Sequence, residues 1–577
     1  MRLLPILLLI TLPALGAEQA YRVIAYHDVQ DEVAGDFDPD QYAVSTRNLI
    51  EHFTWLRDHG FHPVGVDQIV AAHEGRRTLP GNAVLLTFDD GLVSAYTRVF
   101  PLLKLFGYPA VVSIVTSWIE TEGAVEYAGR RLTSKDFLNW SQIREMQESG
   151  LVEIASHSHD LHRGIRGNPQ GNLQPAAVTR GYDGAAYESD AEYRGRIGAD
   201  LALSVATIAA ATGVPPRMIA WPYGAYNDAA ASVAAHHGMH IGLGLGPGPV
   251  VRGETLQLGR HLAIANPGIR DLSAELLLDR SRPPVRMVQL GLDSVFDPDP
   301  LLTGARLDTL LDRVKALQIS HVFLRAVADD DGDGVADAAY FPNRHLPVRA
   351  DLFNHVAWQL RTRSNVRVFA WLPLPGSAAF DAGARESIAD LYEDLAAHAH
   401  FDGLVFRDGE GVDGSAGSGG QARATVELSA ELLARARRFH PELKSVRSLV
   451  ANAPPGPAGT DYLAQDFDSY LDAYDYVALT ATPAADGARA EERFYERLVA
   501  EVSRRASGLD RTIFELQARW PSEGEPDARL RATMWRLQSQ GVRHLGYYPE
   551  DFIAGHPDIG ELRLGISLAE APGGSGL

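Results

Sequence analysis

Two adjacent aspartates, Asp89 and Asp90, follow the apolar run 83–88 and stand directly before Gly91. A run this apolar is typical of a parallel strand buried on both faces, and the glycine lets the chain turn where the carboxylates emerge. Because neighbouring carboxylates repel each other, a divalent cation is an effective way to keep both ionised. Taken alone, the run also fits a solvated Asp-Asp-Gly turn, so other residues must decide between a turn and a site.

Three histidines, His157, His159 and His162, lie within six residues after the strand-like run 151–155. His157 and His162 are five positions apart, a spacing that does not place them on one face of a helix, so a loop after a strand is expected to bring them together. Neutral imidazoles and one carboxylate form a common ligand set for divalent metals. The sequence therefore predicts a metal site made by Asp90 and two histidines, in which His159 is the competitor.

Two further runs are placed to face the same cleft. His27 directly follows the first strand-like run, 21–26, from which its ring could reach the cleft; a histidine satisfied within the core is the alternative. The other run is a turn after a short apolar stretch, whose backbone could supply an amide donor to an oxyanion. Its residues, with the tyrosine expected to pack on a ligand, are Trp221, Pro222, Tyr223 and Gly224.

The elements that must position these residues fall into two domains. The sequence divides best at 279–284, where Pro283 and Pro284 separate an apolar helical pattern from a new strand-like run. This predicts one domain at 18–280 and another at 285–577. In the first domain, short apolar runs alternate with amphipathic stretches, as in α/β proteins.

Periodicity predicts particular elements in both domains. In the first, a helix capped by Ser45 or Thr46 is expected to end at Gly60. It would bury one face, made of Leu49, Phe53 and Leu56. In the second, eight strand-like runs are separated mostly by helical stretches, which is the count expected of a (β/α)8 barrel. These runs are 285–292, 321–327, 366–372, 403–406, 444–450, 476–480, 512–516 and 542–547.

Length, charge and composition exclude several classes of protein. The 577 residues are too many for one ordinary core, and 45% hydrophobic with 22% charged residues is the composition of a folded protein. A formal net charge of -21 argues against nucleic acid as a partner. Residues 1–17 join one arginine to a short apolar run that ends in small residues, as a secretory signal peptide does. With zero Cys there is no thiol for a disulfide or a lipid anchor.

Taken together, the motifs resemble those of a known family. Three of them resemble the first three motifs of the carbohydrate esterase family 4 polysaccharide deacetylases, namely 87–91, 157–162 and 221–224. Others are similar to the periplasmic poly-β-1,6-N-acetyl-D-glucosamine deacetylases of biofilm export systems, namely 168–172, 174–177 and 340–347. The resemblance covers nearly the whole chain after the signal segment. It implies an α/β protein with an N-terminal (β/α) barrel-like deacetylase domain and a C-terminal (β/α)8 barrel.

The resemblance also implies roles in a metal-dependent removal of N-acetyl groups from an exported N-acetylglucosamine polymer. It makes Asp89 the general base, and His27 the general acid with His261 as the alternative. It makes Asp90, His157 and His162 the ligands of a divalent metal ion. Zinc, nickel, cobalt and iron all suit such a ligand set.

The second domain resembles glycoside hydrolases, which usually need two carboxyl groups. Asp408 matches the first aspartate of the relatives, Gly409 replaces the second, and Glu410 and Asp293 are the other candidate carboxylates. The domain is therefore expected to bind the partly deacetylated polymer, with cleavage as the alternative. The acidic run 329–334 is spaced like a calcium loop but has no glutamate at its end, which favours a solvated turn.

The expected place of action is the periplasm or another exported location, with the protein soluble or peripherally associated with the outer membrane. An N-acetylglucosamine polysaccharide is the expected partner, and an export porin of the outer membrane is a further candidate. Two other functions fit the same sequence: a non-catalytic polysaccharide-binding export component, and a deacetylase of chitin or peptidoglycan.

Overall fold

The protein, seen here as a computed structural model, is described in several stretches. These are residues 21–34, 40–246, 249–252, 254–277, 283–331, 335–374, 382–408, 419–452, 463, 466–483, 488–518 and 526–569. The expected signal peptide 1–17 and Glu410 lie outside these residues, as does the side chain of Asp408. No helix among the described residues has both the length and the apolar character needed to cross a membrane.

The chain forms two compact units. Unit 1 consists of Met1–Arg163, Arg194–Ala225 and Ala230–Asp279, and unit 2 of Gly164–Tyr193, Tyr226–Ala229 and Arg280–Leu577. The second unit thus includes a segment from the middle of the region that the sequence assigns to the first domain.

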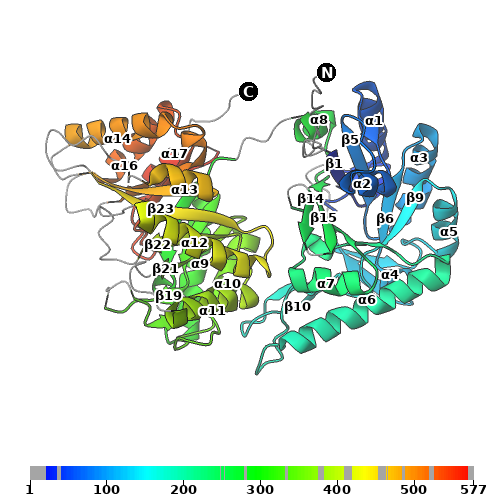
Figure 1. Cartoon of the computed structure of the whole chain (residues 1–577), viewed down its shortest axis with the longest axis horizontal. Coiled ribbons are helices and arrows are strands. Elements are labelled where there is room, and N and C mark those ends of the chain that lie inside the picture. Colours follow the sequence, from blue (N-terminus) through cyan, green and yellow to red (C-terminus); the bar gives the residue numbers. More distant parts are fainter. Residues whose placement is uncertain are drawn as a thin grey trace, which may run out of the picture. The chain divides into compact units, whose positions relative to one another are not determined.

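Unit 1 is built on one ten-stranded sheet (Figure 1). Its strands follow the order β14 (Pro249–Arg252), β15 (Thr255–Gly259), β13 (Ile241–Gly244), β12 (Met218–Ala220), β9 (Val152–Ser156), β6 (Ala110–Ile114), β5 (Ala83–Phe88), β1 (Tyr21–Tyr26) and β16 (His261–Leu262), with β4 (His62–Pro63) also pairing with β5. All pairs are parallel except β14 with β15. The carboxyl ends of the central strands therefore share one edge.

The sheet of unit 1 curves into the expected barrel-like form. Seven of its strands contribute apolar side chains to one interior cluster, among them Val23, Leu85, Val111, Ala155, Ala220, Leu243 and Leu258. The two ends of the curved sheet are joined by consecutive strands, because β15 pairs with β13 whereas β16, one residue further along the chain, pairs with β1. Arg260 is the residue between them.

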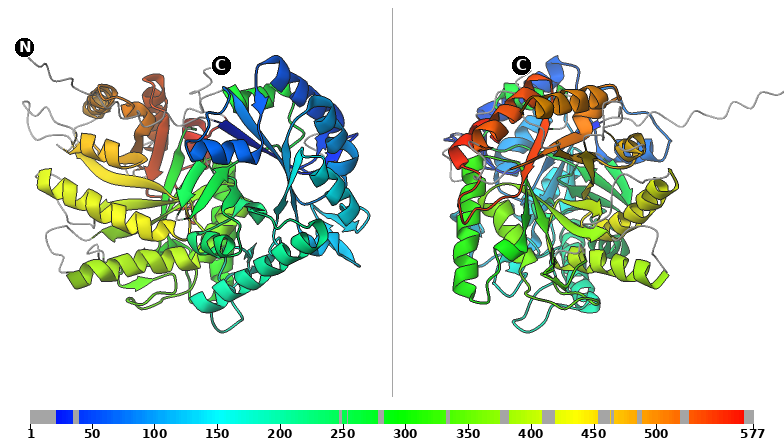
Figure 2. Two further views of the ribbon diagram at one scale, coloured as in Figure 1. Left: turned by 45° about the vertical axis from the view of Figure 1, so that its right-hand side comes forward. Right: turned by 90° about the vertical axis from the view of Figure 1, so that its left-hand side faces the viewer.

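Helices cover the outer side of this sheet (Figure 2, left). They are α1 (Thr46–Asp58), α2 (Val66–His73), α3 (Phe100–Phe106), α4 (Thr116–Ile119), α5 (Trp140–Glu148), α6 (Asp190–Thr212), α7 (Asp228–His236) and α8 (Ile269–Leu277). The prediction for α1 is confirmed: the Ser45 side chain accepts a hydrogen bond from the Asn48 amide, and Leu49, Phe53 and Leu56 are buried.

Unit 2 contains a closed barrel of eight parallel strands, which confirms the expected (β/α)8 architecture. The strands are β17 (Arg286–Gly291), β18 (His321–Arg325), β21 (Arg367–Leu374), β22 (Gly403–Asp408), β23 (Lys444–Asn452), β24 (Tyr476–Thr482), β25 (Thr512–Gln517) and β26 (His544–Tyr548). Apolar side chains such as Met287, Phe323 and Phe369 fill the interior.

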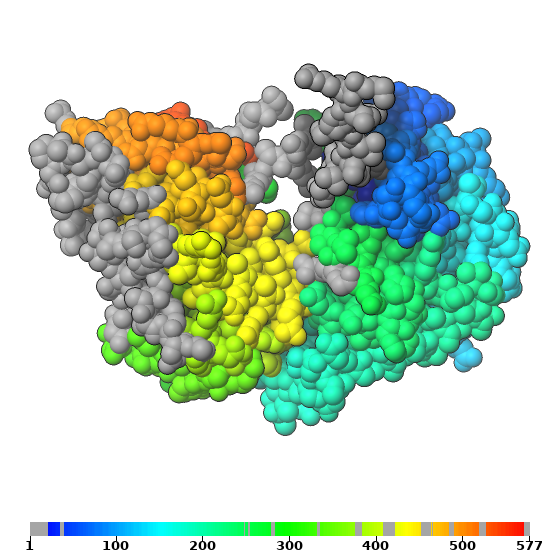
Figure 3. Space-filling model, viewed as in Figure 1, coloured from blue at the N-terminus to red at the C-terminus, as the bar shows by residue number. Residues whose placement is uncertain are grey.

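Helices follow most of the barrel strands. They are α9 (Pro300–Leu317), α10 (Phe353–Arg363), α11 (Ala382–His398), α12 (Gly419–Arg437), α13 (Phe467–Ala473), α14 (Ala488–Ser503), α15 (Gly508–Arg511), α16 (Pro526–Ser539) and α17 (Ile559–Ile566). In the space-filling view, α12 and α13 in yellow and α14 in orange form a continuous side of the barrel (Figure 3).

The segment Gly164–Tyr193 packs on α10 of the barrel through buried amides. The Asn354 side chain donates to the Gly167 carbonyl at 2.9 Å and accepts from the Gln174 amide at 2.8 Å. His355 contacts the Asn172 side chain at 2.6 Å. Asn354 and Gln174 are buried, so these hydrogen bonds replace those that water would otherwise make.

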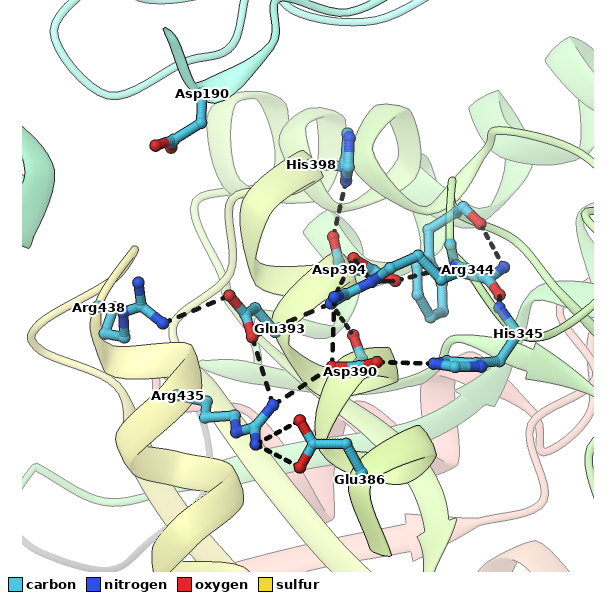
Figure 4. A network of polar contacts seen from close by, with 12 residues as sticks. Asp190, Arg344, His345, Glu386, Asp390, Glu393, Asp394, His398, Arg435 and Arg438 are labelled. Atoms are coloured by element: carbon cyan, nitrogen blue, oxygen red, sulfur yellow. Dashed lines mark hydrogen bonds and ion pairs between the residues drawn. The ribbon is translucent and has the colours of Figure 1, made fainter. Parts of the chain in front are cut away.

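The loop within 340–347 is held by ion pairs on α11 (Figure 4). Arg344 lies 3.0 Å from Asp394 and 3.2 Å from Asp390. From the other side, Arg435 of α12 also contacts Asp390, at 3.3 Å. The shared Asp390 carboxylate links the loop, α11 and α12 in one network. Arg344 of the 340–347 motif therefore has a structural role.

Asn354→Ala tests the role of the buried amides. We expect the free energy of unfolding to fall by about 1 to 3 kcal/mol, because the Gln174 amide and the Gly167 carbonyl lose a buried partner. The measurement is urea unfolding of the full chain followed by tryptophan fluorescence. The matched control is Gln170→Ala, which removes an exposed hydrogen bond to the Asp351 carbonyl and should change stability by less than about 0.5 kcal/mol. Equal stability of the two variants would contradict this packing.

Candidate active site

The predicted motifs converge at the carboxyl ends of four strands of unit 1. Asp89 and Asp90 follow β5, His157 follows β9, the turn 221–224 follows β12, and His27 follows β1. Because these strands are parallel members of one curved sheet, their carboxyl ends share one edge of the sheet, which is where α/β proteins place their sites.

Backbone strain marks three of these motifs. Asp90, Ser158 and Tyr223 have left-handed φ angles of 72°, 71° and 58°. Non-glycine residues rarely adopt such angles, and they concentrate at functional sites, where the surrounding structure holds them in place. The Asp-Asp-Gly run is therefore not an ordinary solvated turn, and Asp89 and Asp90 are both buried.

Asp90, His157 and His162 form a group that could hold a metal ion. Asp90 Oδ1 lies 3.2 Å from His157 Nε2 and 3.4 Å from His162 Nε2, and ligand atoms of all three lie within 4.8 Å of one another. Among the described residues, Asp90 Oδ1 has no hydrogen-bond donor although it is buried. A cation is the partner that such a carboxylate oxygen lacks. The competing His159 is placed elsewhere, with Nδ1 2.9 Å from the Thr116 hydroxyl.

A hydrogen bond orients the His157 imidazole, and burial keeps the His162 imidazole neutral. His157 Nδ1 lies 2.7 Å from the Ala220 carbonyl oxygen, so Nδ1 donates and Nε2 faces Asp90, as in many metal-ligating histidines. Burial lowers the pKa of His157, but the close contact with Asp90 and the charges of both aspartates outweigh it and raise the pKa. Burial lowers the pKa of His162 to about 4, so this ring is neutral at neutral pH and able to act as a ligand.

Asp89 is paired with a buried arginine that the sequence did not single out. Arg260 Nη1 lies 2.8 Å from each Asp89 carboxylate oxygen. The same guanidinium donates through Nε to the Gly244 carbonyl at 3.1 Å. Burial raises the pKa of Asp89, but the Arg260 charge outweighs it and holds the pKa below its ordinary value. Asp89 is therefore an ionised carboxylate in a buried site, which a general base must be.

The structure separates the two candidate acids, His27 and His261. His27 follows β1 at the cleft, stacks near Tyr42 with ring centroids 5.1 Å apart, and has a buried Nδ1 without a hydrogen-bond partner among the described residues. His261 pairs in register with Ile24, on the outer face, and its Nδ1 contacts Glu275 of α8. Since side chains alternate along a strand, Arg260 points into the cleft and His261 away from it.

The turn 221–224 only partly matches its expected role in ligand contact. Trp221 and Pro222 are buried, and the Trp221 indole donates to Gln257 at 3.1 Å. The Trp221 side chain belongs to the core, and substrate binding by this turn stays a prediction. Tyr223 is 50% exposed and its ring lies 4.6 Å from that of His162. Gly224 has a φ of 67°, and a side chain there would meet Leu245.

A second polar cluster lies at the carboxyl end of the barrel of unit 2. Asp293 accepts hydrogen bonds from Arg325 and from the Tyr340 hydroxyl, each at 2.7 Å. The Arg325 guanidinium also lies 5.6 Å from the centre of the Trp371 ring. Arg325 thereby links Asp293 to Trp371. Enzymes with a (β/α)8 barrel have their active sites at this carboxyl end of the strands.

Arg407 and Glu515 complete this cluster. The Arg407 guanidinium lies 5.8 Å from the centre of the Trp371 ring and 6.0 Å from that of Tyr548. Glu515 is buried and accepts from the Thr480 hydroxyl at 2.6 Å, while its Oε1 has no partner among the described residues. Burial raises the pKa of Glu515, and Arg407 and Thr480 offset this only in part. Glu515 is therefore a carboxyl group that burial favours in its protonated form.

One more acidic group contains residues of the run that resembles a calcium loop. Carboxylate oxygens of Asp329, Asp331 and Asp337 lie within 4.8 Å of one another, and the three side chains are half-buried or exposed. Tyr340, where a calcium loop has its glutamate, is buried and bonded to Asp293. Residues 332–334 of this run lie outside the described residues, so the solvated acidic turn stays a prediction.

The sequence did not single out two buried polar residues of the candidate sites, Arg260 between β15 and β16 and Glu515 on β25. Arg260 stands beside the selected His261, and strand alternation decides which of the two faces the cleft. Glu515 stands among the apolar residues Ile513, Phe514 and Leu516 of β25, where a charged residue is rare enough to serve as a signal.

Two family models match the chain. The polysaccharide deacetylase model matches residues 76–242, and the model described as hypothetical glycosyl hydrolase family 13 matches residues 289–383 and 418–548. The poly-β-1,6-N-acetyl-D-glucosamine N-deacetylase of Escherichia coli (strain K12) is 34% identical over 621 residues, which cover 95% of this chain and 92% of that protein.

Solved structures match each half of the chain. The de-N-acetylase from Aggregatibacter actinomycetemcomitans is 39% identical and covers 44% of this chain and 99% of its own, with a TM-score of 0.41. The glycoside hydrolase domain of PgaB (BpsB) from Bordetella bronchiseptica is 37% identical and covers 50% of this chain and 99% of its own, with a TM-score of 0.44.

Arg260→Gln tests the electrostatics of Asp89. A carboxyl group whose folded-state pKa lies below its unfolded value of about 3.9 stabilises the fold above that pH and loses this effect as the pH falls. Without Arg260, burial would be opposed only by the charges of His157 and His27 and would raise the folded-state pKa of Asp89, so the loss of stability should be largest where Asp89 must be charged. We expect a loss of about 3 to 5 kcal/mol at pH 7 and a smaller loss at pH 5.

The measurement is urea unfolding at both pH values. The control is Arg217→Gln, which breaks an exposed ion pair with Glu153 in the same unit and should cost less than about 1 kcal/mol. A loss in Arg260→Gln that is equal at pH 7 and pH 5 would contradict the role of Asp89 as the charged partner.

Proposed function

The chain belongs to the family of the poly-β-1,6-N-acetyl-D-glucosamine N-deacetylases, and on this premise we propose that it removes N-acetyl groups from that polymer during export. The observation that carries the proposal is the buried Asp90, His157 and His162 group beside the ionised Asp89. Family membership makes the chain a polysaccharide deacetylase, and this group supplies the chemistry that such an enzyme needs.

Asp90, His157 and His162 would hold a divalent cation, with zinc, nickel, cobalt and iron all suited to the ligand set. When bound, such an ion polarises an amide carbonyl and lowers the pKa of water. The buried oxygen of Asp90 that faces both histidines without a donor supports this assignment. The orientation of His157 by the Ala220 carbonyl supports it as well.

Asp89 is the proposed general base. Its carboxylate, kept ionised by Arg260, takes a proton from the water molecule that attacks the acetamide carbon. The carbonyl oxygen then carries negative charge. In the turn 221–224, the Trp221 amide donates to the Leu243 carbonyl and the Gly224 amide donates to the Trp221 carbonyl. Tyr223 is therefore the candidate to donate an amide hydrogen to this oxyanion.

His27 is the proposed general acid. It gives a proton to the amide nitrogen as the carbon–nitrogen bond breaks, which releases acetate and leaves an amine on the sugar. Its place at the carboxyl end of β1, beside β5 that carries the aspartates, supports this role. His261 is not proposed, because it faces Glu275 on the outer side of the sheet.

We propose that the enzyme works in the periplasm, exported by the signal peptide at 1–17 and soluble or peripherally associated with the outer membrane. The apolar run of the first residues and the lack of cysteine in the sequence support this placement. An export porin of the outer membrane is the proposed protein partner, since a polymer deacetylated in the periplasm needs a route out of the cell.

The barrel of unit 2 is proposed to bind the partly deacetylated polymer at its carboxyl end. Trp371 and Tyr548 offer aromatic faces there, and Asp293 offers a carboxylate. Cleavage of the polymer is a second candidate function. The raised pKa of Glu515 favours it, because glycoside hydrolysis needs a carboxyl group that is still protonated.

The deacetylase proposal is tested by acetate release from N-acetylglucosamine oligomers. We expect β-1,6-linked oligomers to be better substrates than β-1,4-linked ones, and a chelator to abolish release. Asp89→Asn should lower the rate by about 100- to 10,000-fold through loss of the base. The control is Asp58→Asn, an exposed carboxylate paired with Arg57. Unchanged release in Asp89→Asn would contradict the base, and preference for β-1,4 linkages would favour chitin or peptidoglycan.

The role of the barrel is tested separately by the length of a partly deacetylated polymer. Asp408→Asn and Glu515→Gln should both leave acetate release from short oligomers intact, because these residues lie in unit 2. If the barrel only binds, polymer length measured by size-exclusion chromatography stays constant with the wild-type protein. Shortening by the wild type that is lost in Glu515→Gln would instead establish cleavage.

A further inference from the structure

A β-hairpin of unit 1 brings a tyrosine to the carboxylate of the candidate metal site. Strands β7 (Ala124–Tyr127) and β8 (Arg130–Thr133) are antiparallel, and Tyr127 pairs with Arg130 across the tip. The two residues between them, Ala128 and Gly129, have φ angles of 47° and 76°, as a tight two-residue turn requires. The last residue of β7 is thus held at a defined place.

The two carboxylate oxygens of Asp90 have different partners, and the Tyr127 hydroxyl is the partner of one of them. The Tyr127 hydroxyl donates to Asp90 Oδ2 at 2.9 Å, and Tyr127 is only 6% exposed. Asp90 Oδ1 faces His157 and His162 instead. A hydrogen bond from a buried hydroxyl to a carboxylate is a strong one, so Oδ2 is engaged and Oδ1 is the oxygen left for a cation.

We propose that Tyr127 is a positioning residue that makes Asp90 a ligand through one oxygen only. This inference rests on the proposed metal-dependent function and adds a residue to it. A carboxylate that bound through both oxygens would fill one more coordination position. With Oδ2 engaged by Tyr127, that position stays open for water and substrate, which a catalytic metal site needs.

Neighbouring side chains hold the Tyr127 ring in the position from which its hydroxyl contacts Asp90. The Trp118 ring lies edge-on to Tyr127, with centroids 6.1 Å apart, and also packs on His162 at 4.8 Å. At the other side of the tip, Arg130 lies 3.4 Å from Asp28 and 3.3 Å from Asp40. Trp118 of α4 (Thr116–Ile119) therefore lies between Tyr127 and His162, and Arg130 of the hairpin contacts Asp28, the residue that follows the proposed acid His27.

The test is metal binding by the full chain, measured as competition with a chelator and as the visible absorption of bound Co²⁺. In Tyr127→Phe we expect the dissociation constant for Zn²⁺ to rise about tenfold, which is the lower end of the range of affinity losses caused by removing a group that orients a metal ligand. We also expect weaker Co²⁺ absorption, because a carboxylate that binds through two oxygens raises the coordination number. The control is Tyr96→Phe, which removes an exposed hydrogen bond to Glu145 and should change neither readout.

The outcomes separate this inference from the function on which it rests. If the wild type binds no metal, or Asp90→Asn binds it equally well, the proposed metal site fails. If the wild type binds metal and Tyr127→Phe matches it in affinity and spectrum, only the role of Tyr127 is overturned. Should Tyr127→Phe not fold, Arg130→Gln loosens the hairpin tip, and a Zn²⁺ affinity and Co²⁺ spectrum equal to wild type would overturn the inference in the same way.

Discussion

Two carboxylates on consecutive residues, both buried, dominate the electrostatics of unit 1. Removing a carboxylate from water is costly unless opposite charge or hydrogen-bond donors replace the water. Asp89 meets this requirement through Arg260, and Asp90 meets it at one oxygen through Tyr127, while its other oxygen is the one proposed to bind a cation. The strands, the left-handed backbone at Asp90 and the hairpin β7–β8 all serve to bring these partners within reach of one turn.

The sequence predicted the elements whose signals are local. The eight barrel strands and the α1 helix follow from apolar periodicity and caps. The Asp-Asp-Gly and histidine motifs are recognised from residue types and spacing within a few positions of the chain. The choice between His27 and His261 needed strand pairing, because register decides which face a residue occupies. Arg260 was missed for the same reason.

Other features depended on long-range packing that no local pattern encodes. The segment Gly164–Tyr193 belongs to unit 2 because buried amides on α10 receive it, and its sequence gives no sign of that partner. Trp221 belongs to the turn that is expected to face the ligand, and its indole lies in the core, where it donates to Gln257. In each case the deciding partner lies more than thirty residues away along the chain.

The pKa of a buried carboxyl group is shifted in opposite directions in the two units. Asp89 has an arginine in direct contact and a lowered pKa, whereas Glu515 has a hydroxyl in contact and a raised pKa. The residue type and burial are similar, so the difference lies in the partner. One environment favours a proton acceptor and the other a proton donor, which is how proteins obtain both from the same functional group.

The position of Arg260 has a consequence for when the enzyme becomes active. This arginine sits between β15 and β16, and β16 pairs with β1, the first strand of the unit. The partner of Asp89 therefore arrives only when the last strand of the sheet meets the first. A chain that is still emerging from synthesis therefore lacks the ion pair with Arg260 that keeps the Asp89 carboxylate charged, and this part of the site forms only in the complete unit.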